Sequence, residues 1–361
     1  MYQYYRLFFG IYAQVLCYDA GRMDEVLPKI IAVVGPTCSG KTGIGIALAQ
    51  RLGGEIIAAD SRTVYRGMDI GTAKPEADVN RELSPIYGGV GLPLRSSEGA
   101  KGGGGGDSIT SLFSERPRFV HSIPHWGIDL VNPDEPFTVS QFQAYADEKI
   151  GEILNRGNVP ILVGGTGLYI RAVLDRPNFA GAVPSAEMRR ELDGMSDNDL
   201  FEEIAERDPD AAATIDEKNR RRLVRALEIL RTTGGALADH QAFETPMYDA
   251  CIIGIDVPRE QLYARIDARV DEMIGNGLVD EVRGLLAQYG AECQAMTGIG
   301  YRQIVEFFEK KTSLRDAVIR IKYDSHHYAK RQETWFRRDP RVLWVTSVDA
   351  ALEIADNCLK R

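Results

Sequence analysis

Cysteine and histidine are scarce in this sequence, and they are not spaced as metal ligands. The 361 residues include five cysteines and five histidines, and no two cysteines form a C-x-x-C pair. Zinc sites and the disulfide frameworks of secreted domains both depend on such clusters. The cysteine usage therefore predicts neither kind of site, and it favours a reducing, cytoplasmic location.

The chain also lacks a hydrophobic run long enough for a membrane span. An apolar stretch at residues 7–18 is shorter than the roughly 20 residues that cross a bilayer, and it contains Gln14. Only Arg6 precedes it as a positive charge, so it is a weak match to a signal peptide. We expect no membrane partner, and we interpret residues 1–28 as an N-terminal appendage.

An excess of positive charge is likewise missing. The sequence has 43 Lys and Arg residues against 52 Asp and Glu residues, for a formal net charge of −9. This balance counts against a non-specific nucleic-acid binder, although a local basic groove remains compatible with it. The length suits two domains, or one large domain that carries an insertion.

Short apolar runs recur along the chain, and helical patterns separate them. The runs are KIIAVVG, GEIIAAD, PILVGG, ACIIGID and RVLWV. After the first run, apolar residues at Ile44, Ala47, Leu48 and Leu52 follow a helical spacing. Strands that alternate with helices in this way predict an α/β fold built on a parallel sheet.

Two regions depart from this alternation. Residues 79–119 include a run of five glycines, which predicts a flexible surface insertion. Residues 185–245 have helical patterns throughout, first strongly acidic and then basic over NRRRLVRALEIL. We therefore divide the chain into a core at 29–184, an inserted all-helical domain at 185–245, and the rest of the core with C-terminal helices at 246–361.

The first apolar run leads into a loop with the pattern G-x-x-x-x-G-K-T, which is expected between a strand and a helix. Backbone N–H groups and the start of the helix bind an anion in such loops. Lys41 would add a point charge, and Thr42 would ligate Mg²⁺. The fold prediction is thus a P-loop NTPase-like parallel sheet flanked by helices. The residues predicted to bind a diphosphate or triphosphate are Gly35, Pro36, Thr37, Cys38, Ser39, Gly40, Lys41 and Thr42.

A carboxylate follows the second predicted strand. Asp60 ends the run GEIIAAD, and the carboxyl ends of parallel strands line the ligand crevice in such sheets. Asp60 should therefore face Lys41 and Thr42. From position alone it could be a ligand in the metal shell, a general base, or a cap for the following turn.

Five segments resemble the signature segments of the tRNA dimethylallyltransferases, also known as the IPP transferase family. They occur in the same order between residues 30 and 345, apart from the glycine-rich insertion. The resemblance implies that the loop binds dimethylallyl diphosphate and that the five-carbon group passes to N6 of adenosine 37, beside the tRNA anticodon. The five segments are AADSRTVYRGMDIGTAKP, VNPDEPFTVSQF, PILVGGTGLYI, TGIGYRQ and KRQETWFR.

The resemblance also implies roles for individual residues. Asp60 would be the general base, and Lys41 and Thr42 would complete the catalytic set, with Mg²⁺ as the cofactor on Thr42. The partner would be the anticodon stem-loop of a tRNA that carries adenosines at positions 36 to 38. The residues implied to contact the tRNA are Asp60, Ser61, Arg62, Thr63, Thr166, Arg189, Arg221, Arg222, Leu223, Val224, Arg225, Tyr301 and Arg302.

Some positions depart from the family pattern or have ordinary structural interpretations. Thr63 stands where the family commonly has glutamine, and His125 stands alone where many members have a histidine pair. These differences concern recognition more than the reaction. Trp335 and Phe336 are interpreted as core residues. No heptad run or obvious interface argues against a monomer.

Three other functions are compatible with the phosphate loop. An adenylate isopentenyltransferase would move the same group to a free nucleotide, but it has no use for the helical insertion and its arginines. A small-molecule kinase would need a lid with catalytic arginines, which we do not find in the sequence. A binding module without catalysis would leave Asp60 unused. The tRNA-modifying function accounts for most of the sequence features.

Overall fold

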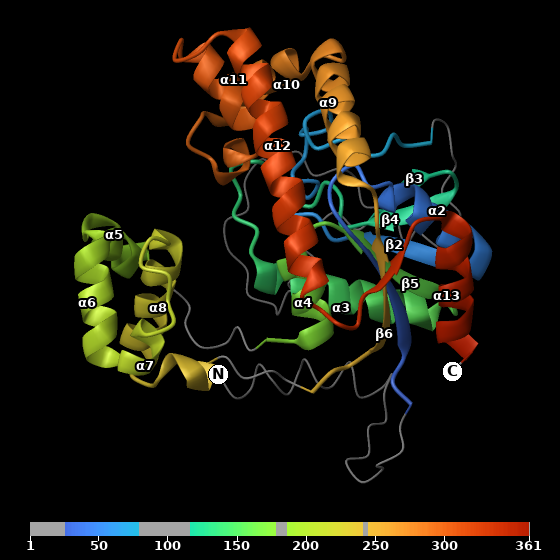
Figure 1. Ribbon diagram of the computed structural model, residues 1–361, viewed down its shortest axis with the longest axis horizontal. Coiled ribbons are helices and arrows are strands. Elements are labelled where there is room, and N and C mark those ends of the chain that lie inside the picture. Colours follow the sequence, from blue (N-terminus) through green and yellow to red (C-terminus); the bar gives the residue numbers. More distant parts are fainter. Residues whose placement is uncertain (1–25, 79–115, 178–185, 241–244, 361) are drawn as a thin grey trace, which may run out of the picture.

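The computed structural model describes residues 26–78, 116–177, 186–240 and 245–360 (Figure 1). Most of the predicted N-terminal appendage and most of the glycine-rich insertion lie outside these ranges. Within them, no helix combines the length and the apolar character needed to cross a membrane.

The core of the fold is a seven-stranded sheet in the order β3-β4-β2-β5-β1-β6-β7. All neighbouring strands pair in parallel except β3 and β4, which pair antiparallel. The predicted α/β fold with a mostly parallel sheet is confirmed. The strands are β1 (Lys29–Val34), β2 (Gly54–Ala58), β3 (Arg118–Val120), β4 (Ile123–Trp126), β5 (Val159–Gly164), β6 (Asp249–Ile255) and β7 (Leu343–Val345).

The central strand β1 is apolar throughout because both of its faces are covered. Ile30, Ala32 and Val34 pack into one hydrophobic cluster, and Ile31 and Val33 pack into another. All five side chains are fully buried. Complete burial of an aliphatic side chain contributes about 1.5–3 kcal/mol, so this strand anchors the sheet.

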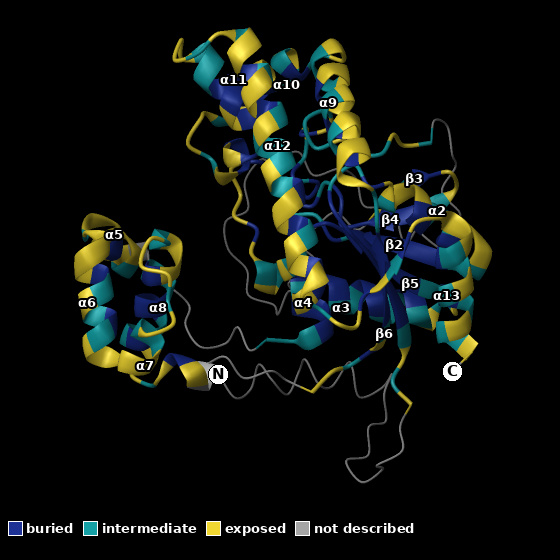
Figure 2. Cartoon of the chain, viewed as in Figure 1, coloured by how far each residue is buried: buried dark blue, intermediate teal, exposed yellow. Residues whose placement is uncertain are grey.

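Helices cover both faces of the sheet (Figures 1 and 2). Residues of α2 and α13 belong to the cluster on one face, and residues of α3 and α4 belong to the cluster on the other. Further helices, α9 to α12, pack together, and α12 contacts α9, α11 and α4. The helices of the core are α2 (Lys41–Leu52), α3 (Val139–Asn155), α4 (Gly167–Asp175), α9 (Arg259–Gly275), α10 (Leu278–Tyr289), η4 (Gln294–Thr297), α11 (Tyr301–Phe308), α12 (Leu314–Arg337) and α13 (Val348–Lys360).

Residues 186–240 form a separate helical unit, which stands beside the core on the side away from α2 and α13 (Figure 1). It has its own hydrophobic cluster, which includes Leu192, Leu200 and Leu227. Local signals define its helices, since Ser196 forms a capping box at the start of α6 and Gly234 ends α8 in a left-handed conformation. The unit consists of α5 (Ala186–Gly194), α6 (Asp197–Arg207), α7 (Pro209–Ala212), α8 (Arg220–Thr233) and η3 (Leu237–His240).

One expectation about the cysteines is wrong. Cys251 on β6 and Cys358 on α13 form a disulfide across a sequence separation of 107 residues, with their Cα atoms 6.1 Å apart. This Cα distance is normal for a disulfide. The sequence could not show the pair, because only the packing of α13 against β6 brings the two residues together. Cys38 and Cys293 are free thiols.

Candidate functional site

The loop between β1 and α2 has the backbone conformation of an anion-binding loop. Gly35, Cys38 and Gly40 all have positive φ values, of 147°, 60° and 94°. Gly40 precedes α2 without a side-chain cap, so the first N–H groups of the helix are not satisfied by a capping group. The 12-residue helix therefore offers these N–H groups and the positive end of its dipole to a ligand.

Two side chains of this loop are suited to contact an anion. Lys41 curls back over the loop, and its Nζ donates a hydrogen bond to the Pro36 carbonyl at 2.6 Å. Burial lowers the pKa of Lys41 to about 8, an effect that Asp60 and Cys38 oppose and that Arg269 reinforces. The Ser39 hydroxyl is buried and has no hydrogen-bond partner among the described residues. An orphaned buried hydroxyl in such a loop fits a phosphate oxygen.

Asp60 lies near Lys41, as the parallel sheet predicts. Its Oδ1 accepts a hydrogen bond from the Arg62 backbone N–H at 2.8 Å. The Ser61 N–H donates to Thr166 Oγ1 at 3.1 Å, which ties the turn after β2 to the start of α4. Burial raises the pKa of Tyr328 to about 12, and the nearby Asp60 carboxylate adds to this rise. Asp60 thus sits between a cationic loop and a buried phenol.

Gln332 joins the phosphate loop to the segment that carries Thr166. The Thr37 N–H donates to Gln332 Oε1 at 2.8 Å, and Gln332 Nε2 donates to the Gly165 carbonyl at 2.9 Å. Gln332 is almost fully buried on α12. A Cβ at position 165 would lie 2.1 Å from Gln332 Nε2, so a side chain there would displace this amide. The amide therefore fixes the spacing of two loops that meet at the carboxyl edge of the sheet.

Several core residues that were predicted to contact tRNA are engaged within the protein. The guanidinium of Arg62 donates to the carbonyls of Gln294 and Ala295, at 3.1 and 3.4 Å. Thr63 is buried, with 8% of its surface exposed, so a direct contact of its side chain with tRNA is not supported. Tyr301 is only 1% exposed, so a direct contact of its side chain with tRNA is likewise not supported.

The buried Tyr301 has a structural role instead. Its hydroxyl donates to Glu281 Oε1 at 2.7 Å. The same carboxylate accepts three backbone N–H groups, from Asp69, Ile70 and Gly71, at 2.7–3.0 Å. Glu281 and Tyr301 thereby attach α10 and α11 to the segment that follows Asp60 in sequence. The neighbouring Arg302 is exposed and pairs with Asp324 at 2.8 Å.

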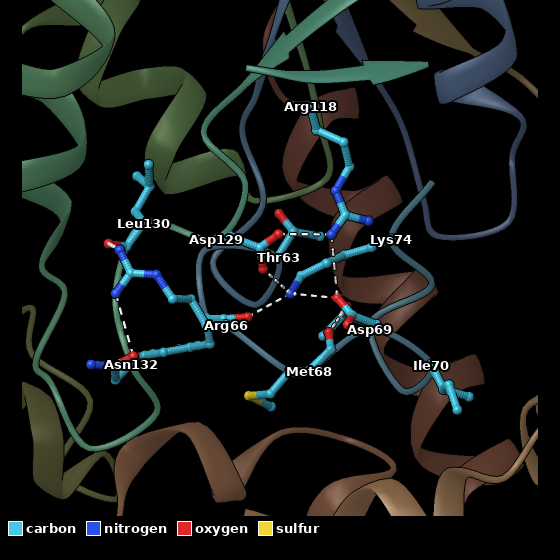
Figure 3. Close-up of polar contacts among 12 residues, drawn as sticks. Thr63, Arg66, Met68, Asp69, Ile70, Lys74, Arg118, Asp129, Leu130 and Asn132 are labelled. Atoms are coloured by element: carbon cyan, nitrogen blue, oxygen red, sulfur yellow. Dashed lines mark hydrogen bonds and ion pairs between the residues drawn. The ribbon is translucent and has the colours of Figure 1, made fainter. Parts of the chain in front are cut away.

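A buried lysine stabilises the far end of the segment that follows Asp60 (Figure 3). Lys74 Nζ donates to the Tyr65 carbonyl and to Asp129 Oδ1, and it pairs with Asp69 at 3.0 Å. Arg118 lies over the same two carboxylates, 2.7 Å from Asp129 and 3.6 Å from Asp69. Burying an unpaired ammonium is costly, whereas this one has three acceptors. The network gives residues 60–74 a defined conformation.

The arginines of the helical unit differ in their partners and in their exposure. Arg220 and Arg231 bind groups inside the unit, such as Asp197 and Glu203. Arg189 and Arg225 are partly exposed and share Glu228. Arg221 and Arg222 are exposed, and their side chains form no ion pair with another residue in the described ranges.

Two other members of the predicted tRNA-contact set are hydrophobic. Leu223 is fully buried in the cluster of the helical unit, and Val224 packs against that cluster. The buried Leu223 side chain therefore offers no contact surface, whereas Val224 is only partly buried. Phe336 is buried as predicted, whereas the prediction that Trp335 is a core residue is wrong. Trp335 remains 41% exposed, with its indole against Gly167.

No preformed metal cluster exists in the part of the chain that the structure describes, since no three His, Cys, Asp or Glu side chains gather there. Mg²⁺ does not require one, because it often binds through one or two protein oxygens, waters and substrate phosphates. Thr42 is exposed in the first turn of α2, beside Lys41. These residues fit an ion that a diphosphate brings to the loop.

Sequence reasoning missed three residues that shape the site. Gln332 lies within the segment KRQETWFR, but its contact with Thr37 can be seen only in the folded structure. Arg269 lies on α9 and lowers the pKa of Lys41, yet its sequence context contains no motif. Glu228 is a buried carboxylate on a basic helix, and its apolar neighbours could have drawn attention to it.

Fold and site together define an α/β protein with a P-loop-like sheet, in which a glycine loop with the geometry of an anion site lies beside a strand-end carboxylate. The family model of the IPP transferases matches residues 113–339, and the model of the isopentenyl transferases matches residues 28–87. The chain belongs to the IPP transferase family, and the resemblance noted in the sequence is confirmed.

Relatives with this family's activity in their names match most of the chain. The tRNA dimethylallyltransferase of Roseiflexus sp. (strain RS-1) is 40% identical over 319 residues, which cover 87% of this chain and 92% of that protein. The tRNA dimethylallyltransferase of Moorella thermoacetica is 41% identical over 325 residues, with coverages of 87% and 89%.

Solved structures agree with this assignment. The full-length tRNA isopentenylpyrophosphate transferase of Bacillus halodurans is 35% identical, with a TM-score of 0.60, and the match covers 92% of this chain and 95% of that one. A eukaryotic dimethylallyltransferase acting on tRNA is 25% identical, with a TM-score of 0.67 and coverages of 91% and 77%.

We predict that Gln332→Leu weakens both the fold and the phosphate loop. The substitution leaves the part-buried Thr37 N–H and the buried Gly165 carbonyl without their partner. Such losses cost about 1–3 kcal/mol, which denaturant unfolding would measure. Binding of inorganic diphosphate, measured by calorimetry, should weaken as well.

Gln303→Leu is the matched control, because Gln303 is an equally buried amide that contacts Gly300 and Asp324. It should lower the free energy of unfolding without changing diphosphate affinity. Equal diphosphate affinities for Gln332→Leu and the wild type would contradict the prediction.

The pKa of Lys41 predicts a pH dependence of anion binding. Because its pKa is lowered to about 8, Lys41 carries its charge below this pH and loses it above. The affinity of the ligand-free protein for inorganic diphosphate, measured without divalent cations, should therefore fall as the pH rises through about 8. Lys41→Arg stays charged throughout this range, and the ratio of the two profiles removes the ligand's own titration. Parallel profiles would argue against the prediction.

Proposed function

We propose that the protein transfers the dimethylallyl group of dimethylallyl diphosphate to N6 of adenosine 37 in tRNA. The products are N6-dimethylallyladenosine and diphosphate. Membership of the IPP transferase family supports the substrates. The observation that carries the reaction is the placement of the Asp60 carboxylate within electrostatic reach of Lys41 in the phosphate loop.

Binding of the diphosphate is the first task of the site. An allylic diphosphate ionises readily because its carbocation is resonance-stabilised, so the main requirement is to stabilise the charge that develops on the departing diphosphate. The N–H groups at the start of α2, the Ser39 hydroxyl and the Lys41 ammonium are directed to this task. Arg269 adds positive charge from α9.

Activation of the acceptor is the second task. An exocyclic adenine amine becomes a good nucleophile only as its proton leaves, and a positioned carboxylate can take that proton as the C–N bond forms. Asp60 has one oxygen fixed by the Arg62 N–H. Its other oxygen has no hydrogen-bond partner among the described residues, which leaves it available to the amine.

We infer that Mg²⁺ assists this reaction and that Thr42 contributes a ligand. Bound Mg²⁺ would neutralise negative charge on the diphosphate. The exposed hydroxyl of Thr42 and the adjacent loop fit this role.

We further propose that the acceptor is the anticodon stem-loop of a tRNA with adenosines at positions 36 to 38, and that the protein works as a cytoplasmic monomer. The target adenosine must leave its stack to reach Asp60. Exposed arginines of the helical unit and Arg302 of the core are suited to the phosphates of the stem. In a reducing compartment Cys251 and Cys358 would be thiols in contact.

We predict transfer of radiolabelled dimethylallyl to unmodified tRNA and not to free AMP when both are offered. Replacing adenosine 37 with guanosine should abolish labelling. Asp60→Asn should bind dimethylallyl diphosphate normally and lower the rate of transfer by about 10²–10⁴-fold, the usual contribution of a general base.

Label in AMP would instead identify an adenylate isopentenyltransferase. ATP consumption without transfer would identify a kinase or another phosphotransferase. Undiminished transfer by Asp60→Asn would eliminate the base assignment while leaving the overall reaction intact.

Removal of magnesium should also stop the reaction. We predict that EDTA reduces transfer to background and that added Mg²⁺ restores it, because the diphosphate charge is then compensated again. Thr42→Val keeps the shape of the side chain without its hydroxyl. It should need a higher Mg²⁺ concentration for half-maximal rate, and an unchanged Mg²⁺ requirement would count against Thr42 as a ligand.

A further inference from the structure

A buried carboxylate lies between two partly exposed arginines in the helical unit. Glu228 on α8 has only 1% of its side chain exposed. Its Oε1 accepts a hydrogen bond from Arg189 Nε at 2.9 Å, and its Oε2 accepts one from Arg225 Nη1 at 3.1 Å. Arg189 and Arg225 remain 55% and 41% exposed. Each oxygen of the carboxylate thus serves a different guanidinium.

The arrangement joins two helices at one surface. Arg189 comes from α5, whereas Arg225 and Glu228 are three residues apart on α8 and therefore share a face. Arg221 precedes Arg225 by one helical turn, so it extends the same face. Arg189 uses its Nε for Glu228, which leaves the two terminal amino groups of its exposed fork for another anion.

Other ion pairs of this unit differ in exposure. Glu203 also binds two arginines, Arg207 and Arg231, but Arg231 is only 17% exposed. Its carboxylate therefore stabilises the junction of α6 and α8. The second partner of Glu203, Arg207, is 46% exposed, and Glu203 itself is 18% exposed. Among the described ion pairs of this unit, Glu228 differs because the carboxylate is buried while both of its arginines are exposed by more than 40%.

We propose that Glu228 is a positioning residue, which holds Arg189 and Arg225 side by side as a binding site for backbone phosphates of the tRNA. This inference rests on the proposed function. Two guanidiniums at this spacing would repel each other, and the buried carboxylate offsets that repulsion. The trio keeps a net charge of +1, and Arg221 on the same face raises it to +2. A guanidinium whose orientation is fixed loses less entropy when it binds a phosphate.

The decisive experiment compares tRNA binding by the wild type and by Glu228→Gln as a function of salt. If Glu228 were merely an acidic group near RNA, its removal would strengthen binding. If it positions the arginines, its removal weakens binding by about tenfold, the equivalent of one charge-assisted contact. The slope of log affinity against log salt should also become shallower by about 1. At saturating tRNA the rate of transfer should stay unchanged, so that the effect appears in KM alone.

A double-mutant cycle separates positioning from general damage to the unit. If Glu228 acts through Arg189 and Arg225, Glu228→Gln should have little additional effect on tRNA affinity in an Arg189→Ala/Arg225→Ala background. Glu203→Gln is the matched control, because it removes a two-arginine carboxylate from the same unit. It should lower the thermal stability of the unit but leave tRNA affinity within about twofold of the wild type. Glu228→Asp keeps the charge and should recover part of the affinity.

Tighter binding by Glu228→Gln, or additive effects in the cycle, would overturn the inference. Both outcomes require a wild-type protein that binds tRNA and transfers the group to it. A wild-type protein that did neither would refute the proposed function instead.

Discussion

The parallel pairing of β1, β5 and β2 is the constraint on which the site depends. Val34 lies opposite Gly164, and Ala58 lies opposite Val163, so three strands end at one edge and at nearly one level. The loops that follow then have to meet: the Thr166 N–H donates to the Ala59 carbonyl at 3.2 Å. A Cβ at position 164 would lie 2.0 Å from that carbonyl oxygen, so the approach of the loops requires glycine. Burial of β1 on both faces stabilises the pairing.

The long helix α12 holds the loops after β1 and β5 in a fixed position relative to each other. Gln332 binds the phosphate loop and the loop after β5, while Tyr328, one turn earlier, lies close to Asp60. Further toward the start of α12, Asp324 binds Gln303 and Arg302 of α11. One helix therefore connects the diphosphate loop, the proposed base and helix α11. A displacement of α12 would change all three positions together.

Much of the fold and of the diphosphate site could be predicted from the sequence, because their signals are local. A β-branched run followed by G-x-x-x-x-G-K-T specifies strand, loop and helix within 14 residues or so, and Asp60 follows from strand order. The contacts and the degree of burial of Arg62, Tyr301 and Trp335 could not be predicted. Each packs against a segment more than 150 residues away, Gln294 for Arg62, Gly71 for the ring of Tyr301 and Gly167 for Trp335. No pattern within a single segment records such distances. The disulfide between Cys251 and Cys358 was missed for the same reason.

The acidic composition and the need to bind a polyanion are reconciled by pairing inside the helical unit. Several of its acids pair with its own arginines: Glu203 and Glu191 bind Arg231, and Asp197 binds Arg220. What determines RNA binding is then the set of cations that remain exposed, and not the formal charge of −9. Arg221 and Arg222 belong to this set because they lack partners among the described residues, whereas Arg189 and Arg225 belong to it although they share one. A buried acid that holds two arginines at a surface lowers the net charge of the protein by one. The ligand nevertheless meets a positively charged site. Net charge is therefore a poor guide to partners wherever carboxylates are buried beneath the cations that they orient.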